Sequence, residues 1–157
     1  MRAYSLLVAA AALLISCGPA QQPATTSSPQ PAAAPKPLDE SHRFPKANLL
    51  DSKVVDKGLL GKAFMPGGTL ARYRKNGRDY EIFAAQLPSP LDAAILLPDW
   101  KKALAGAKLE ASFGGYFGDD QGRPVFVFVK GSWIAGIAGL PEKDADAQAR
   151  VLAAELN

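Results

Sequence analysis

The sequence predicts a small α+β domain in which a mainly antiparallel sheet carries its helices packed on one face. Three patterns support this fold class. Two strand-like runs flank Asn76-Gly77, residues 125–129 are apolar without interruption, and residues 141–156 repeat Ala and Leu at helical spacing. Residues 38–157 form one domain, because about 120 residues are enough to enclose a single hydrophobic core.

Residues 69–87 predict a β-hairpin, because Asn76-Gly77 suits the positive φ angles of a type I′ turn. The turn sets the register, which places three pairs of residues side by side: Tyr73 with Tyr80, Arg72 with Glu81, and Arg74 with Asp79. Four basic residues surround the turn: Arg72, Arg74, Lys75 and Arg78. We interpret them as part of a solvated sheet face with cross-strand ion pairs; the alternative is a contact with a phospholipid or lipopolysaccharide headgroup.

Two short helical segments are expected after the hairpin. Ser89 serves as the N-cap, Pro90 occupies the first helical position, and Asp92 closes an arrangement like a capping box. Pro98 breaks or kinks the helix, and Gly106 ends the second segment.

The next stretch predicts one strand and one loop. Residues 108–113 read as a half-buried strand with three side chains directed inward: Leu109, Ala111 and Phe113. Residues 114–122 read as a loop, because they are rich in glycine and other turn residues. We interpret Asp119 and Asp120 as polar turn residues rather than calcium ligands, because the ligand spacing and the terminal Glu of an EF-hand are absent.

Two further strands and a helix complete the domain. Residues 125–129 are apolar on both faces, which predicts a central strand covered on both sides, or covered on one side and part of an interface on the other. Residues 133–139 alternate small and bulky side chains, and a glycine inside a strand indicates a bulge or a close backbone approach. Residues 141–156 predict a helix packed on the sheet, and a strand near residues 53–55 precedes the hairpin.

Cys17 is the one cysteine of the chain, and it directly follows an apolar run. Arg2 supplies a positive start, residues 6–15 are too short to span a bilayer, and Ser16 is a small residue before the cleavage point. This pattern resembles the lipobox of bacterial lipoproteins. The resemblance implies that residues 1–16 are a signal peptide and that Cys17 is lipidated with palmitate and related chains. The alternatives are a transmembrane anchor and an ordinary secretory signal.

The lipobox resemblance also implies a location in the cell envelope, with the protein held at a membrane by its acyl chains. Gly18 stands where inner-membrane lipoproteins of Gram-negative bacteria usually carry Asp. The outer membrane, with the domain facing the periplasm, is therefore favoured if the source is Gram-negative. Residues 17–37 contain six prolines and no large apolar side chain, which predicts a disordered tether that reaches up to roughly 60 Å.

Four local motifs lie between residues 69 and 156. They are the Tyr-bearing hairpin, Ser-Pro-x-Asp-Ala at residues 89–93, Val-Lys-Gly-Ser-Trp at residues 129–133, and the closing Ala-rich helix. In these motifs and their order the region resembles an uncharacterised family of bacterial envelope proteins, a domain of unknown function found in secreted and lipoprotein contexts. The resemblance covers just over half of the chain and supplies no functional residues.

The composition of residues 38–157 disfavours several classes of function. Sixteen Lys and Arg stand against fifteen Asp and Glu there, which gives no support for nucleic-acid binding. The region has no cysteine, and its single histidine, His42, lies at the edge of the linker. Neither a Ser-His-Asp set nor a thiolate metal site is expected. We therefore predict that the protein is not an enzyme and has no catalytic residue, cofactor or metal ligand.

The remaining hypothesis is a membrane-anchored, non-catalytic binding or assembly module of unknown biochemical activity, with an envelope protein as its partner. The alternative is a carrier or sensor of a small apolar ligand in a groove between helix and sheet. Four aromatic residues are the candidates for ligand or partner contact: Trp100, Tyr116, Phe117 and Trp133. For Trp100 by itself, we favour an anchor that packs the helix against the sheet over a platform for a ligand.

Overall fold

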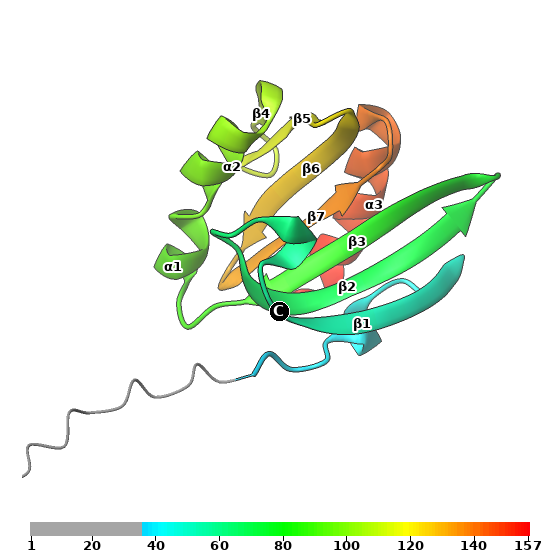
Figure 1. The fold of residues 1–157 in the computed structure, drawn as a ribbon, viewed down its shortest axis with the longest axis horizontal. Coiled ribbons are helices and arrows are strands. Elements are labelled where there is room, and N and C mark those ends of the chain that lie inside the picture. The colour runs from blue at the N-terminus through cyan, green and yellow to red at the C-terminus, as the bar shows by residue number, and fades with distance from the viewer. Residues whose placement is uncertain (1–35) are drawn as a thin grey trace, which may run out of the picture. The chain divides into compact units, whose positions relative to one another are not determined.

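The computed structural model describes residues 36–157, which form one antiparallel sheet of seven strands with a few helices (Figure 1). The strands lie in the order β1-β2-β3-β7-β6-β5-β4. The α+β class and the antiparallel sheet are therefore confirmed. The predicted signal peptide, residues 1–16, Cys17, and the tether up to residue 35 lie outside the described residues.

The elements follow one another along the chain with short connections. The strands are β1 (Leu49–Lys57), β2 (Pro66–Lys75), β3 (Arg78–Gln86), β4 (Ala105–Glu110), β5 (Gly115–Asp120), β6 (Arg123–Lys130) and β7 (Trp133–Ala138). The helices are α1 (Pro90–Ala94), α2 (Leu97–Ala103) and α3 (Glu142–Glu155), and two short 3-10 segments are η1 (Ser41–Arg43) and η2 (Leu59–Gly61).

The β2–β3 hairpin has the register that the sequence predicts. Tyr73 lies opposite Tyr80, and Arg74 opposite Asp79. Asn76 and Gly77 have φ angles of 52° and 74°, as a type I′ turn requires. The register of the two strands could be predicted because it depends on the two turn residues, Asn76 and Gly77, and not on contacts with the rest of the domain.

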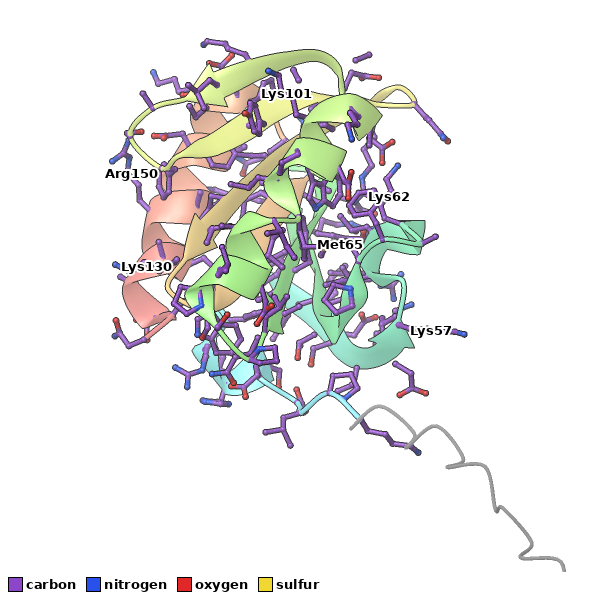
Figure 2. The ribbon with its side chains drawn as sticks, turned by 90° about the vertical axis from the view of Figure 1, so that its left-hand side faces the viewer. Lys57, Lys62, Met65, Lys101, Lys130 and Arg150 are labelled. Carbon is purple, nitrogen blue, oxygen red and sulfur yellow. The ribbon has the colours of Figure 1, made fainter. Side chains whose placement is uncertain are left out.

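The helices cover both faces of the sheet, so the prediction that they pack on one face is wrong. Helix α3 packs Ala149 and Leu152 on the face that carries Phe126, whereas α2 packs Trp100 on the opposite face, which carries Val127. Figure 2 shows α1 and α2 as a layer in front of the sheet, with Met65 beside them. The physical reason is that β6 and β7 are buried on both faces, and each face needs its own cover.

The predicted loop at residues 114–122 is wrong, because most of it forms strand β5. Two of its glycines are required by close packing rather than by a turn. A Cβ atom at Gly115 would lie 2.1 Å from the backbone oxygen of Val127, and one at Gly118 would lie 2.9 Å from Cβ of Leu104. The turn at this hairpin is confined to Gln121-Gly122, where both φ angles are positive.

The inward direction of Leu109 is also wrong. Strand β4 is an edge strand that ends at Glu110, and the Leu109 side chain is 58% exposed. Phe113 follows the strand and packs against Phe126 and Phe128, with ring centroids 5.4 and 5.0 Å away. The alternation of apolar residues therefore did not predict which side chains of this edge strand are buried.

The start of α1 and the position of Trp100 agree with the sequence. Ser89 Oγ accepts a hydrogen bond from the backbone N–H of Asp92 at 3.2 Å, and Pro90 is the first residue of α1. Trp100 is fully buried, stacks on Phe83, and donates its indole N–H to the sulfur atom of Met65 at 3.1 Å. It is therefore an anchor in the core.

Candidate functional site

Strand β2 runs between two pockets at opposite ends of the sheet. At its first residues, Lys36, Gly67 and Gln86 line a pocket of about 200 Å³ where the chain joins the domain. At its last residue, Lys75, the β2–β3 turn lies beside α3 and encloses a second pocket of about 280 Å³. At about 3.3 Å per residue, the ten residues of β2 separate these ends by roughly 30 Å.

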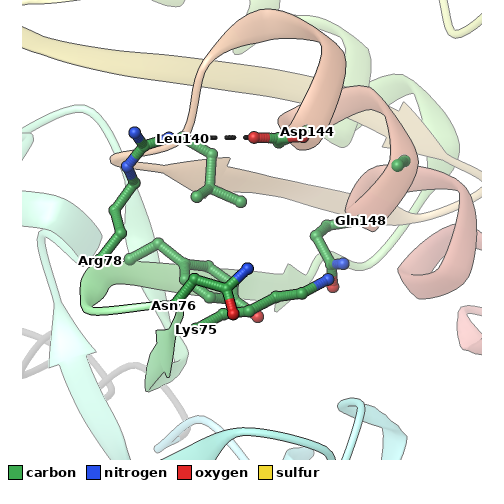
Figure 3. A pocket seen from close by; sticks show the side chains of 8 residues that line it. Lys75, Asn76, Arg78, Leu140, Asp144 and Gln148 are labelled. Atoms are coloured by element: carbon green, nitrogen blue, oxygen red, sulfur yellow. Dashed lines mark ion pairs between the residues drawn. The ribbon is translucent and has the colours of Figure 1, made fainter.

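The pocket at the β2–β3 turn is mostly polar (Figure 3). We call it the turn pocket. Its lining comes from the hairpin and from the beginning of α3: Lys75, Asn76, Arg78, Tyr80, Leu140, Asp144, Ala147 and Gln148. The hairpin contributes side chains on both sides of a rigid turn, and successive turns of α3 place Asp144 and Gln148 on one side of that helix.

The turn pocket has more positive than negative charge. Arg78 Nη1 lies 3.9 Å from Asp144 Oδ2, and both side chains are more than half exposed, so this ion pair is weak. Lys75 forms no ion pair with any residue between 36 and 157. The pocket therefore contains two cationic side chains and one carboxylate. The side-chain amides of Asn76 and Gln148 add further hydrogen-bond donors.

Tyr80 adds a hydroxyl group to the turn pocket. Its ring stacks on Tyr73, with centroids 5.0 Å apart. Burial raises the pKa of Tyr80 above its usual range, so the group is a hydroxyl donor and not a phenolate. The Tyr73 O–H already donates to the backbone oxygen of Pro45 at 2.9 Å. Tyr80 has no such partner within residues 36–157, and its oxygen is not a buried unpaired atom, so the hydroxyl keeps access to solvent.

The polar face on the other side of the hairpin is already paired. Arg72 pairs with Asp51, Arg74 pairs with Asp79 at 2.7 Å, and Arg123 pairs with Glu81 at 2.8 Å. The arginine hydrogen bonds hold the carboxyl pKa values of Asp51 and Asp79 below their usual range. A pocket of about 370 Å³ on this face is therefore lined by cations that have carboxylate partners.

This pairing refines the predicted cross-strand ladder. Arg72 is the register neighbour of Glu81, but its ion pair goes to Asp51 on β1, because Glu81 is engaged by Arg123. Arg74 pairs with Asp79 as its register predicts. Of the four basic residues near the turn, Lys75 and Arg78 are those left to face the turn pocket.

The four aromatic candidates do not line a common groove. Trp100 and Trp133 are 0% and 2% exposed and belong to the hydrophobic clusters on opposite faces of the sheet. Tyr116 and Phe117 are consecutive in β5, so they also point to opposite faces. None of these four residues lines any of the three pockets described here. Cys17, the predicted lipidation site, lies outside the described residues.

The acidic pair in the β5–β6 hairpin has structural partners. Asp119 Oδ1 accepts a hydrogen bond from the backbone N–H of Gly122 at 2.6 Å, and Asp120 forms an ion pair with Lys62 at 2.6 Å. Across residues 36–157, no group of three or more His, Cys, Asp and Glu side chains is arranged to hold a metal ion. The turn pocket, by contrast, is lined by Lys75, which forms no ion pair within residues 36–157, and by Arg78, whose only ion pair there is long and exposed.

Sequence reasoning missed the contribution of α3 to the turn pocket. Asp144 and Gln148 are ordinary polar positions on an amphipathic helix, and no local pattern connects them to a hairpin more than 60 residues earlier. Comparison of the chain with protein-family models, with curated proteins and with solved structures finds no match. Of the helices that the structure describes, none has the length and apolar character needed to cross a membrane.

Proposed function

We propose that this chain is a lipid-anchored, non-catalytic binding module of a bacterial cell envelope, and that its turn pocket holds an anionic group of an envelope partner. One observation carries the proposal. The donor-rich pocket lies at the end of β2 opposite to the end where the predicted tether joins the domain. A module that is anchored at one end and binds at the other keeps its site accessible while it stays at the membrane.

The anchor rests on the sequence. A lipid-modified Cys17 would attach the chain to a membrane, and residues 18–37 would span up to roughly 60 Å between the lipid and the domain. Gly18 in place of Asp favours the outer membrane with the domain in the periplasm, if the organism is Gram-negative. The resemblance to the uncharacterised envelope family points to the same compartment.

The ligand class follows from the chemistry of the turn pocket. Lys75 and Arg78 supply positive charge, and Tyr80, Asn76 and Gln148 supply neutral donors. Carboxylate and phosphate groups match this set, because their oxygens accept several hydrogen bonds at once. Both cations are solvent-exposed, so we expect modest affinity that falls as salt is added.

The carrier hypothesis has less support. It needs an apolar groove between helix and sheet, yet Trp100 and Trp133 are used in the core and the turn pocket is polar. A binding module with a polar site for anions is consistent with a polar turn pocket and with Trp100 and Trp133 in the core, and it needs no buried ligand. No reaction is assigned to the site, since none of its groups is paired as a nucleophile with a base.

The experiment is an NMR titration of the unlipidated Cys17→Ser chain with inorganic phosphate and, separately, with acetate. We expect the amide signals of Asn76, Gly77 and Gln148 to shift and saturate with at least one anion. The double variant Lys75→Ala/Arg78→Ala should lose this response, because it removes both cations of the pocket.

The matched control is Arg72→Ala, which removes a cation from the same hairpin but from the paired polar face. This variant should bind the anion as the parent chain does. Shifts that spread over the polar face and vanish with Arg72→Ala, or no response to either anion, would contradict the pocket.

A further inference from the structure

An unpartnered apolar surface covers the outer side of α1 and the residues around it. We call it the α1 stripe. Leu91 is 72% exposed and Ile95 is 58% exposed. Further exposed apolar residues surround them: Pro88, Pro90, Ala94 and Pro98. Two carboxylates lie beside this set. Asp92 is turned to the Ser89 hydroxyl, which lies 2.6 Å from its Oδ2. Asp99, four residues after Ile95, forms an ion pair with Lys102, so its charge has a partner of opposite sign.

The spacing of the α1 stripe is that of a helix face meant to be covered. Leu91, Ala94, Ile95 and Pro98 follow the i, i+3, i+4, i+7 pattern of a buried stripe. The core side of the same segment is already used, because Ala93 and Trp100 are fully buried against the sheet. A segment that is apolar on both sides and covered on one is typical of an interaction surface.

The α1 stripe lies at the end of the sheet where the chain joins the domain. Gln86, the last residue of β3, lines the same pocket as Lys36 and Pro37, and the N-cap Ser89 follows three residues later. In Figure 1, α1 and the start of the coloured chain both lie toward the lower left, whereas the β2–β3 turn points to the upper right. The stripe and the point where residues 36 and 37 enter the domain therefore lie at the same end of the sheet.

We propose that the α1 stripe docks on the lipid surface to which the tether is attached, an inference that rests on the proposed lipid anchor. A tether of about 20 residues holds the stripe close to that surface, so even a weak contact is populated through effective concentration. Lys130, the last residue of β6, is exposed beside the β6–β7 turn. This turn is joined to the segment before α1 by the hydrogen bond from Leu87 N–H to the Ser132 oxygen. The charge of Lys130 suits anionic headgroups.

A second protein chain fits the α1 stripe less well. Stable protein interfaces use roughly 20 to 30 residues on each side. The stripe offers six apolar residues on one short helix and its flanks. Docking on lipid would turn the turn pocket away from the membrane by roughly the length of β2, and so orient the domain with its binding site outward.

The test compares two exposed apolar positions in the full lipidated chain bound to vesicles of phosphatidylethanolamine and phosphatidylglycerol. Ile95→Cys reports on the stripe, and Leu50→Cys is the matched control, because Leu50 is 51% exposed at the start of β1, near the opposite end. Each is labelled with an environment-sensitive fluorophore. At position 95 we expect a blue shift, several-fold weaker quenching by iodide, and quenching by nitroxide lipids; position 50 should show none of these.

The outcomes separate the docking from the anchor. If the chain floats with the vesicles but both positions respond alike, the docking is overturned while the anchor stands. If iodide is excluded from position 95 without quenching by nitroxide lipids, a protein or a second copy covers the stripe and the docking is overturned. If the chain does not float, the anchor fails and the docking fails with it.

Discussion

Arg123 on β6 reaches across strand β7 to Glu81 on β3, where its Nη2 donates a hydrogen bond to Oε2 at 2.8 Å. The same nitrogen donates to the backbone oxygen of Ala138 in the intervening strand at 3.2 Å. The pair therefore joins three adjacent strands on the polar face. Because Glu81 is engaged by Arg123, Arg72 on β2 pairs with Asp51, and this ion pair joins edge strand β1 to β2.

We predict a measurable coupling between Arg123 and Glu81. A double-mutant cycle with Arg123→Met and Glu81→Gln should give about 0.5–1 kcal/mol in the free energy of unfolding, because both side chains are partly shielded. The control cycle is Lys102 with Asp99 on α2, whose lysine is 79% exposed. It should give roughly 0.3 kcal/mol or less by urea denaturation. Equal couplings would contradict the account of the polar face.

Gly136 should not tolerate a side chain. A Cβ atom there would lie 2.1 Å from the backbone oxygen of Phe126 and 2.6 Å from the ring of Phe83. We expect Gly136→Ala to lower the free energy of unfolding by about 2–3 kcal/mol through overpacking. The control Gly131→Ala meets open space at a φ of 55° and should cost about 1 kcal/mol. A Gly136→Ala chain as stable as the control would contradict the predicted close approach.

Stability should fall in acid partly because of Asp51 and Asp79. Their folded-state carboxyl pKa values lie below the ordinary value of 3.8, through hydrogen bonds from Arg72 and Arg74. The unfolded chain therefore binds more protons in this window, so the contribution is complete above about pH 5 and is lost as pH falls below about 4.

The measurement for these carboxylates is the urea midpoint at about pH 5 and at about pH 2.5. The double variant Asp51→Asn/Asp79→Asn should lose less stability between the two conditions than the parent chain does. Asp56→Asn is the control, because it removes a carboxylate from β1 that forms no ion pair within residues 36–157, and it should not reproduce the effect of the double variant. An unchanged response in the double variant would show that the two pairs do not stabilise the fold.

Local chemistry explains which parts of the fold were predictable. The Asn76-Gly77 turn determines the register of β2 and β3, and Ser89 with Pro90 determines where α1 begins, because each depends on residues close in sequence. The helical spacing of α3 shows that one side is apolar but not which face of the sheet it covers. That choice depends on both faces of β6 being apolar, a property shared among distant strands.

The candidate site was less predictable than the fold. The lysine and arginine of the turn were visible in the sequence, but Gln148 and Asp144 come from a helix that meets the hairpin only in three dimensions. The aromatic candidates show the reverse problem: their roles as ligand contacts could not be separated from packing by sequence. Trp100 and Trp133 have the same composition signal whether they bind a ligand or pack a core, and the structure places both in the core.

The lipid anchor at Cys17 is the central claim and can be tested directly. The chain is expressed in a bacterium fed labelled palmitate, and the mature protein is analysed by mass spectrometry beside its Cys17→Ser variant. We predict a mature chain that begins at an acylated Cys17, with no label in the variant. A mature chain that begins elsewhere without acylation, or continued palmitate incorporation in Cys17→Ser, would contradict the account.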